Sequence, residues 1–342
     1  MVEIAPPVER SLIKSELRPE RFLRKTNKAG NDIYVVDAHN SPHTMREIAR
    51  LREVAYRDGG GGNGTEIDMD EFDTMEEPYQ QLILWDPEDE EIIGGYRFIE
   101  GEKVKFDAEG QPELATSHIF KFSGEFITGY LPYTIELGRS FIQPQYQSSA
   151  KGMKSLFSLD NLWDGLGALI LLYPEYKYFF GKVTMYAGFD PQARNLILSF
   201  LDFFFPDKNH LVYPHKLFRT PAQLKKKEAI FEGLEYKEAY KILNTAVRKR
   251  GVNVPPLVNA YMSLSSTMKT FGTTIDKDFS NVYETAILIT IEDIFEEKCK
   301  RHIETSANSL PKHVIDLIRQ RYWGLQNSVG KNRKIVQQLL AS

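Results

Sequence analysis

The chain has 342 residues, 42% of them hydrophobic, and a formal net charge of −4 at pH 7. This length and composition are ordinary for a globular protein with a full core in one large domain or two, and we expect no nucleic-acid partner. The single cysteine, Cys299, excludes an internal disulfide and fits a reducing cytosol.

Charge is distributed unevenly along the chain. From residue 222 onward there are 19 Lys and Arg against 13 Asp and Glu, a net of +6, which leaves −10 for residues 1–221. A basic C-terminal third indicates an acidic partner or an anionic membrane surface. The longest apolar run, Leu166 to Tyr173, is too short to span a bilayer. We therefore expect a soluble, cytoplasmic protein and leave open a peripheral position at the inner membrane.

The N-terminal part predicts an arm, a strand and a helix. The arm covers residues 1–29, and the first strand is expected at 33–36. Ser41 followed by Pro42 is typical of a helix start, and apolar residues then recur at helical spacing. This helix carries the arginines Arg50, Arg52 and Arg57. Arg52 is our candidate for holding a substrate carboxylate, and the alternative is a solvated basic face.

An acidic segment, residues 66–73, follows a run of glycines. Its alternating carboxylates are compatible with a calcium loop, but no glycine and late glutamate complete that ligand set, so no metal is expected. One interpretation is an exposed acidic loop. The other is a lip that attracts a cationic amine, or that forms salt bridges with Arg97 or Arg139 to shape a pocket.

A hairpin of strands 81–85 and 92–99 is predicted next, followed by the central strand. The central strand alternates apolar and polar residues, and Glu136 falls on its polar side, away from the core. We interpret Gly138 as a β-bulge, which inserts one residue and brings Glu136 and Arg139 onto one side of the strand.

A polar loop, residues 143–152, and a helix from Met153 to Leu172 follow the central strand. Unpaired amides and the helix dipole favour an anion at such a helix N-terminus, and the arrangement suits a phosphopantetheine thioester. The loop lacks the Gly-x-Gly spacing of a dinucleotide site. The candidates for contacting the pantetheine arm and its phosphate are Ser140, Ser148, Ser149, Lys151 and Gly152.

The rest of the chain predicts further core elements and a basic addition. A strand at 178–185, a helix at 191–204 and a last strand at 283–291 belong to the core. The predicted organisation is an arm (1–29), a core (30–221 and 253–295), an inserted basic helical hairpin (222–252) and a basic helical tail (296–342). One face of the hairpin carries Lys237, Lys241 and Arg248. That face suits docking on an acidic carrier protein or a membrane, and the alternative is a solubilising face.

Seven short stretches of the chain together resemble one family. They are Glu136 to Ser140, Leu162 to Trp163, Tyr178 to Val183, Asp70 to Asp73, Gly94 to Arg97, Tyr261 to Leu264 and Asp276 to Phe279. Their order is similar to that in the hemolysin-named branch of the GNAT-like acetyltransferase superfamily. Its members include acyl-carrier-protein-dependent N-acyltransferases that make ornithine lipids, glycine lipids and N-acyl amino acids. Acyl-homoserine lactone synthases are more distantly similar. The chain differs from the ornithine-lipid enzymes in having Tyr79 and Gln80 where those enzymes usually carry a histidine.

The resemblance implies a GNAT-like acyltransferase α/β fold, with a central mixed, mostly antiparallel sheet flanked by helices, to which the helical hairpin and the C-terminal helical tail are added. It favours Asp70 and Asp73 as the acidic residues near the amine. Glu136, the carboxylate of the central strand, is the candidate general base, and the alternative is that it only pairs with Arg139. Arg139 either locks Glu136 or holds the carboxylate of an amino acid, a role for which Arg97 competes.

The function predicted first is an N-acyltransferase that moves a long-chain fatty acyl group, with or without a 3-hydroxyl, from acyl carrier protein to the α-amine of an amino acid, with glycine preferred. No cofactor is expected to bind tightly, and the acyl-phosphopantetheine thioester, on carrier protein or CoA, is a co-substrate. Tyr186 is a candidate proton donor to the leaving thiolate. The alternatives are an acetyl-CoA-dependent N-acetyltransferase, a homoserine-lactone-type signal synthase, and a non-enzymatic acyl-binding or membrane-active protein.

Overall fold

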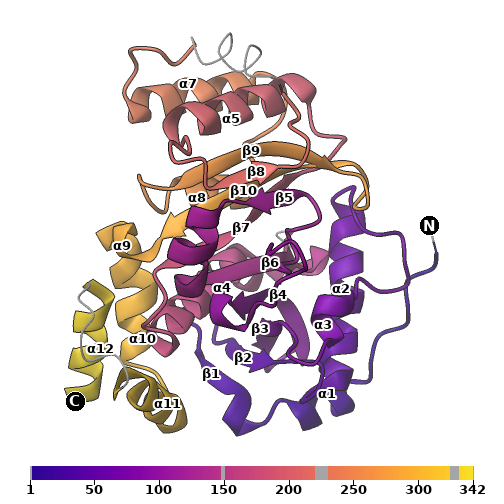
Figure 1. Cartoon of the computed structure of the whole chain (residues 1–342). Coiled ribbons are helices and arrows are strands. Elements are labelled where there is room, and N and C mark those ends of the chain that lie inside the picture. Colours follow the sequence, from indigo (N-terminus) through magenta and orange to yellow (C-terminus); the bar gives the residue numbers. More distant parts are fainter. Residues whose placement is uncertain (1, 148–150, 220–229, 324–330, 342) are drawn as a thin grey trace. The chain divides into compact units, whose positions relative to one another are not determined.

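The computed structural model describes residues 2–147, 151–219, 230–323 and 331–341. The chain divides into two compact units. The first comprises Met1–Lys103, Tyr133–Lys177 and Phe295–Ser342, and the second comprises Val104–Pro132 and Tyr178–Ile294. Figure 1 shows the elements of both units along the chain.

An antiparallel sheet of five strands forms the centre of the first unit, in the order β1-β2-β3-β4-β6. The strands are β1 (Phe22–Lys25), β2 (Asp32–Val36), β3 (Gln80–Asp86), β4 (Glu91–Glu100) and β6 (Thr134–Ile142). The predicted hairpin and central strand are therefore confirmed. The segment expected to be an arm contributes α1 (Arg10–Glu16), a short 3-10 turn η1 (Pro19–Arg21) and strand β1.

Helices α2 (Pro42–Asp58) and α4 (Met153–Leu172) cover opposite faces of this sheet. Gln81 contacts Arg52 of α2, whereas Leu82 lies against Gly165 of α4, and successive residues of a strand point to opposite faces. An added Cβ at Gly165 would lie 2.6 Å from the Leu82 side chain, so the glycine allows this close packing. Both helices span the residues that their apolar spacing predicts.

The C-terminal tail belongs to the first unit and packs against α4. Its elements are α9 (Glu296–Lys298), the π-helical turn η8 (Cys299–Glu304), α10 (Thr305–Ala307), α11 (Lys312–Trp323) and α12 (Lys331–Ala341). His302 of η8 is buried, and its Nδ1 lies 2.8 Å from Asp164 of α4. Lys154–Leu172 in α4 is long and apolar enough to cross a membrane, but 67% of it is buried inside the protein, which favours a core helix.

Smaller elements complete the first unit. They are α3 (Glu71–Thr74) and the 3-10 turns η2 (Gly101–Lys103) and η5 (Pro144–Tyr146). The 3-10 turn η4 (Leu131–Tyr133) spans the point where the chain passes from the second unit to the first.

Three antiparallel strands in the order β7-β10-β9 form the sheet of the second unit, beside a two-stranded β5-β8 ribbon. The strands are β7 (Tyr178–Met185), β9 (Lys269–Asp276), β10 (Val282–Thr290), β5 (Phe120–Phe122) and β8 (Val212–Pro214). The helices and turns are η3 (Phe126–Tyr130), α5 (Pro191–Phe204), α7 (Tyr236–Arg248), α8 (Pro256–Met262) and η7 (Ile291–Asp293). Asp190 caps α5, since its carboxylate accepts from the amides of Gln192 and Ala193.

Only part of the predicted helical hairpin can be compared, because residues 220–229 lie outside the described residues. Helix α7 packs on α5 through its buried Ala239, Leu243 and Val247, and the aromatic rings of Tyr236 and Phe200 lie 5.5 Å apart. In each unit the paired strands are antiparallel and helices flank the sheet, in agreement with the predicted GNAT-like α/β fold.

Candidate active site

The candidate site lies in the first unit, where β6 carries a bulge. Gly95 of β4 pairs with Phe141 of β6, but Arg97 pairs with Gly138, so β6 has one more residue than β4 between these pairs. The left-handed backbone is at Arg139, with φ 47°, and not at the predicted Gly138. The glycine that this stretch requires is on the other strand, because a Cβ at Gly94 would lie 2.3 Å from the carbonyl oxygen of Phe141.

Glu136 points to the α2 face of the sheet and is only 2% exposed, so the prediction that it lies away from the core was wrong, because α2 packs against β6 on this face. Tyr79, the fully buried residue just before β3, donates a hydrogen bond from its hydroxyl to Oε2 of Glu136. The guanidinium of Arg97 lies over the Tyr79 ring, 5.1 Å from its centroid. Side chains from three adjacent strands therefore meet on this face.

The acidic segment pairs with arginines, which is one of the roles predicted for it. Arg97 donates to both carboxylate oxygens of Asp70, at 2.7 and 2.8 Å, and lies 3.4 Å from Asp73. Arg52 of α2 binds Asp73 at 2.9 Å in a fully buried pair, and Gln81 also donates to Asp73. Asp70 and Asp73 form a capping box at the start of α3. Arg52 thus holds a carboxylate of the protein itself.

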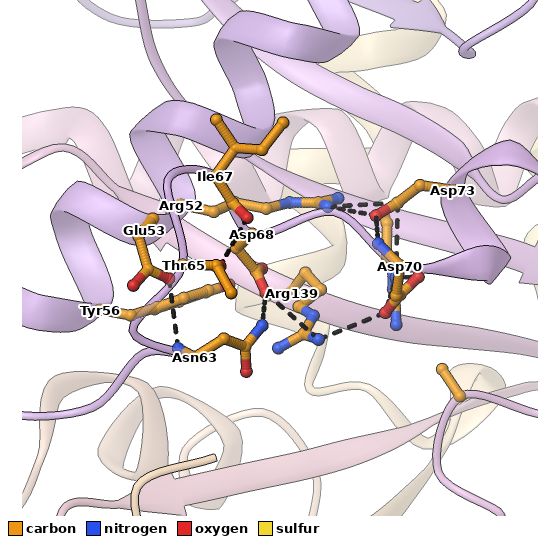
Figure 2. A network of polar contacts seen from close by, with 12 residues as sticks. Arg52, Glu53, Tyr56, Asn63, Thr65, Ile67, Asp68, Asp70, Asp73 and Arg139 are labelled. Atoms are coloured by element: carbon orange, nitrogen blue, oxygen red, sulfur yellow. Dashed lines mark hydrogen bonds and ion pairs between the residues drawn. The ribbon is translucent and has the colours of Figure 1, made fainter. Parts of the chain in front are cut away.

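Arg139 joins this network on its solvent side. Its NH2 group lies 3.3 Å from Asp68 and 3.2 Å from Asp70, as Figure 2 shows. The side chains of Arg139 and Asp70 are 20% and 25% exposed, whereas that of Arg97 is only 4% exposed. A ligand approaching from solvent therefore meets Arg139 and Asp70 first.

The arginines and aspartates shift one another's pKa values. Burial by itself raises the pKa of Asp70, but the charges of Arg97 and Arg139 outweigh it and hold the pKa well below its usual range. Burial dominates at Asp68 and raises the pKa of its carboxyl in spite of the nearby arginines. Burial also works against the charge on Arg97, yet Asp73 and Asp70 raise its pKa above the ordinary value. Arg97 and Asp70 are therefore held as a charged pair.

Within the predicted phosphate loop, Ser148 and Ser149 lie outside the described residues. Gly152 precedes α4 with a positive φ of 56°. Lys151 binds Asp89 at 2.8 Å, and both side chains are partly exposed. The half-buried Ser140 accepts a hydrogen bond from Tyr56 at its backbone oxygen, at 3.3 Å.

The remaining predicted residues belong to the second unit. Tyr186 is half-buried and directly follows β7, and its backbone oxygen accepts from the amide of Phe189. Lys237, Lys241 and Arg248 are exposed along α7. In the part of the chain that the structure describes, no group of three or more His, Cys, Asp or Glu side chains gathers closely enough to hold a metal ion.

Comparisons with known proteins identify the family of the chain. Residues 51–156 match the acetyltransferase (GNAT) domain. The chain is 53% identical over 312 residues to the glycine N(alpha)-acyltransferase of Phocaeicola vulgatus, covering 91% of this chain and 96% of that protein. It is 54% identical over 311 residues to the enzyme of the same name from Bacteroides thetaiotaomicron, covering 91% and 92%. The chain belongs to this acyltransferase family.

Among solved structures, the N-acyl amino acid synthase FeeM from uncultured soil microbes covers 76% of this acyltransferase and 92% of its own chain, at 13% identity and a TM-score of 0.39. Structural similarity at this identity and TM-score supports no conclusion about the function of this chain. The matched domain, by contrast, contains the acidic segment, the bulged strand β6 and the start of α4.

Sequence reasoning missed several residues of the site in this acyltransferase. It noted Tyr79 only as a departure from related enzymes, and it passed over Asp68 although this residue lies in the same acidic segment as Asp70. It also passed over Lys154, in the first turn of α4, which binds Asp86 at 2.7 Å. A basic residue in a first helical turn is itself a signal, because the helix dipole disfavours it unless an acid lies nearby.

Proposed function

We propose that this acyltransferase moves a long-chain fatty acyl group from acyl carrier protein to the α-amine of glycine and releases an N-acyl glycine, a lipid or lipid precursor. The observation that carries this proposal is the identity of 53% and 54%, over more than nine-tenths of each chain, to two enzymes named glycine N(alpha)-acyltransferase.

The partly exposed pair of Arg139 and Asp70 offers complementary charges to an amino acid zwitterion. A guanidinium binds a carboxylate, and a carboxylate binds an ammonium group. Arg139 is the better candidate for the acceptor's carboxylate, because its side chain is 20% exposed whereas that of Arg97 is 4% exposed. Asp73 and Arg52 then have a supporting part, since they are fully buried behind this pair.

Glu136 is the proposed base. The incoming ammonium gives up a proton to Glu136, directly or through a water molecule, and the neutral amine attacks the thioester carbon. The C–N bond forms, the C–S bond breaks, and the nitrogen releases its second proton to solvent as the amide forms. The leaving thiolate takes up a proton, for which Tyr186 is the proposed donor, and Tyr186 is reprotonated from solvent. The hydrogen bond from Tyr79 fixes the orientation of the Glu136 carboxylate. Backbone amides near the bulge at Arg139 and Ser140 are proposed donors to the thioester oxygen.

The donor is proposed to bind as a transient co-substrate and not as a resident cofactor. Lys151 and the amide of Gly152, at the start of α4, are the proposed contacts for the pantetheine phosphate. The basic face of α7 is proposed to meet the acidic carrier protein in the cytoplasm, or anionic lipid when the enzyme lies at the inner membrane.

The test is a turnover assay with purified protein. Palmitoyl-carrier protein, 3-hydroxypalmitoyl-carrier protein, palmitoyl-CoA and acetyl-CoA are each incubated with glycine, ornithine, lysine, serine or S-adenosylmethionine, and thiol release and product mass are followed. We expect the fastest turnover with a long-chain carrier-protein thioester and glycine. Turnover with acetyl-CoA alone would make the protein an acetyltransferase, and release of a lactone from an S-adenosylmethionine acceptor would make it a signal synthase. Thioester binding without turnover in any combination would overturn the enzymatic proposal.

A further inference from the structure

The loop of residues 62–66, beside the site, is attached to the buried carboxylate of Glu53 in α2. Oε2 of Glu53 accepts from the backbone amide of Asn63 at 3.2 Å, and Oε1 accepts from that of Gly64 at 2.9 Å. Arg57, one turn further along α2, donates to the same carboxylate at 2.6 Å. Gly62 has φ 91°, and a Cβ there would lie 3.2 Å from Glu53. The glycine therefore allows the loop to close on the carboxylate.

The other edge of the loop is held by the N-terminal segment. The amide of Val2 donates to the carbonyl of Gly64 at 3.0 Å, and that of Ala5 donates to Glu66 at 3.1 Å. Arg57 also reaches the carbonyl of Val2, at 2.6 Å. Hydrogen bonds to Glu53 on one side and to the N-terminal segment on the other therefore fix the backbone of the loop, independently of its side chains.

Asn63 and Asp68 connect the fixed backbone of the loop to the candidate site. The side-chain amide of Asn63 donates to Oδ1 of Asp68, and the same oxygen lies 3.3 Å from the guanidinium of Arg139. Asp68 is buried, and among the described residues its second oxygen has no hydrogen-bond partner. Figure 2 shows the resulting series of contacts from Glu53 through Asn63 and Asp68 to Arg139.

We propose that Glu53, Asn63 and Asp68 are positioning residues, which hold the Arg139 guanidinium in the orientation that receives the carboxylate of the amino acid acceptor. This rests on the proposed function, in which Arg139 is the anchor for that carboxylate. An arginine side chain loses much rotamer freedom when it binds a ligand, so fixing it beforehand strengthens binding. Loss of this positioning should therefore weaken binding of the amino acid acceptor and leave binding of the acyl donor unchanged.

The first test is Asn63→Ala, which removes the donor to Asp68 and leaves the charges of the site in place. We expect KM for glycine to rise about tenfold, the order of one hydrogen bond to a charged group, while kcat and KM for palmitoyl-carrier protein stay within about twofold. Titration calorimetry of glycine should show the same loss of affinity. Asn244→Ala is the matched control, because Asn244 of α7 donates within its own helix, to the Tyr240 carbonyl at 3.0 Å.

A double-mutant cycle then separates positioning from general destabilisation. In an Arg139→Ala background, Asn63→Ala should have no further effect on KM for glycine. Asp68→Asn, which keeps the shape of the side chain, serves as a second variant if Asn63→Ala melts below the assay temperature, and it should also raise KM for glycine.

An unchanged KM for glycine in both variants, or an undiminished effect in the Arg139→Ala background, overturns the positioning role. Wild-type enzyme that uses no glycine at all overturns the proposed function instead.

Discussion

Tyr79 and Glu136 are hydrogen-bonded across the sheet although their strands are not neighbours. Tyr79 precedes β3, Glu136 belongs to β6, and β4 lies between these strands. Arg97 of β4 lies over the Tyr79 ring, so the hydroxyl, the carboxylate and the guanidinium are arranged from three strands. A rigid sheet holds such groups more accurately than a loop can.

This relationship predicts unequal effects of two substitutions. Glu136→Gln removes the proposed base and should lower kcat by about 10²- to 10⁴-fold, the usual contribution of a general base. Tyr79→Phe removes only the hydrogen bond that orients the base and should lower kcat by about tenfold. Both are measured with saturating palmitoyl-carrier protein and glycine. A Glu136→Gln enzyme with wild-type kcat would show that another group accepts the proton.

Substitutions of the two site arginines should have different effects, one mainly on the stability of the fold and the other mainly on substrate binding. Arg97 is 4% exposed and pairs with Asp70 and Asp73, so Arg97→Met removes a buried positive charge from both aspartates and should destabilise the fold by about 3 kcal/mol. Arg139→Met, on the exposed side, should destabilise it much less and mainly raise KM for glycine. Urea unfolding and steady-state kinetics distinguish these outcomes. Equal loss of stability in both variants would contradict the assignment of Arg139 to the acceptor.

The buried carboxylate of Asp276 in the second unit, with the charged groups around it, gives a pH-dependent prediction. His118 and Lys182 lie 2.9 and 3.2 Å from Asp276, and Lys182 also lies 3.0 Å from Glu284. Burial by itself raises the pKa of Asp276, but the hydrogen bond from His118 and the charge of Lys182 outweigh it and hold the pKa below its unfolded value of 3.8. The stabilisation is therefore complete above that value and is lost as pH falls through the folded pKa.

Asp276→Asn tests this assignment. The variant should be less stable than wild type by about 3 kcal/mol at pH 7 and at pH 5, and the difference should shrink at pH 3 and below. The measurement is urea unfolding of both proteins at each pH, because the difference between them cancels the titration of other carboxylates. A difference that grows as pH falls would have the wrong sign for a depressed pKa.

The sequence predicted a strand or helix correctly where the spacing of its apolar residues matched the period of that element. Strands β3, β4, β6 and β7 and helices α2, α4 and α5 follow their apolar spacing. Strand β9 was missed because its buried positions include Thr270, Thr273 and Thr274, and because Gly272, with φ 81°, interrupts the alternation. A hydrophobic pattern does not register buried threonines.

The arrangement of the candidate site was less predictable from sequence. A glycine in β6 suggested the position of the bulge, but the space for it is provided by Gly94 on β4, a residue of another strand. The contacts between Tyr79 and Glu136 and between Asp68 and Arg139 join residues 57 and 71 positions apart, and no local pattern specifies such pairs.

Lys151 supplies a prediction about the donor. It binds Asp89 at 2.8 Å, and this hydrogen bond lowers the pKa of Asp89 to about 2, so the two stay paired at neutral pH. If Lys151 holds the pantetheine phosphate, Lys151→Ala should raise KM for the thioester donor about fivefold, within the range for one exposed charged contact. Asp89→Ala removes the competing carboxylate and should lower that KM. Donor kinetics unaffected by both substitutions would exclude Lys151 from the phosphate site.

The basic face of α7 supplies the last prediction, which concerns the partner that presents the acyl group. Lys237, Lys241 and Arg248 are exposed, while Ala239, Leu243 and Val247 hold the helix on α5. Reversing the three charges to Glu should leave the melting temperature unchanged and raise KM for palmitoyl-carrier protein on the order of tenfold, without affecting palmitoyl-CoA. The wild-type KM for the carrier protein should also rise with salt.

The matched control reverses Lys121, Lys208 and Lys216, three exposed lysines elsewhere in the second unit. If this control raises the KM for the carrier protein equally, the effect comes from net charge and not from a docking face. If the α7 variant instead keeps its carrier kinetics but no longer binds anionic vesicles, the face meets lipid headgroups. The two partners are thus separated because a carrier protein changes the kinetics of the donor, whereas a membrane surface changes only where the enzyme resides.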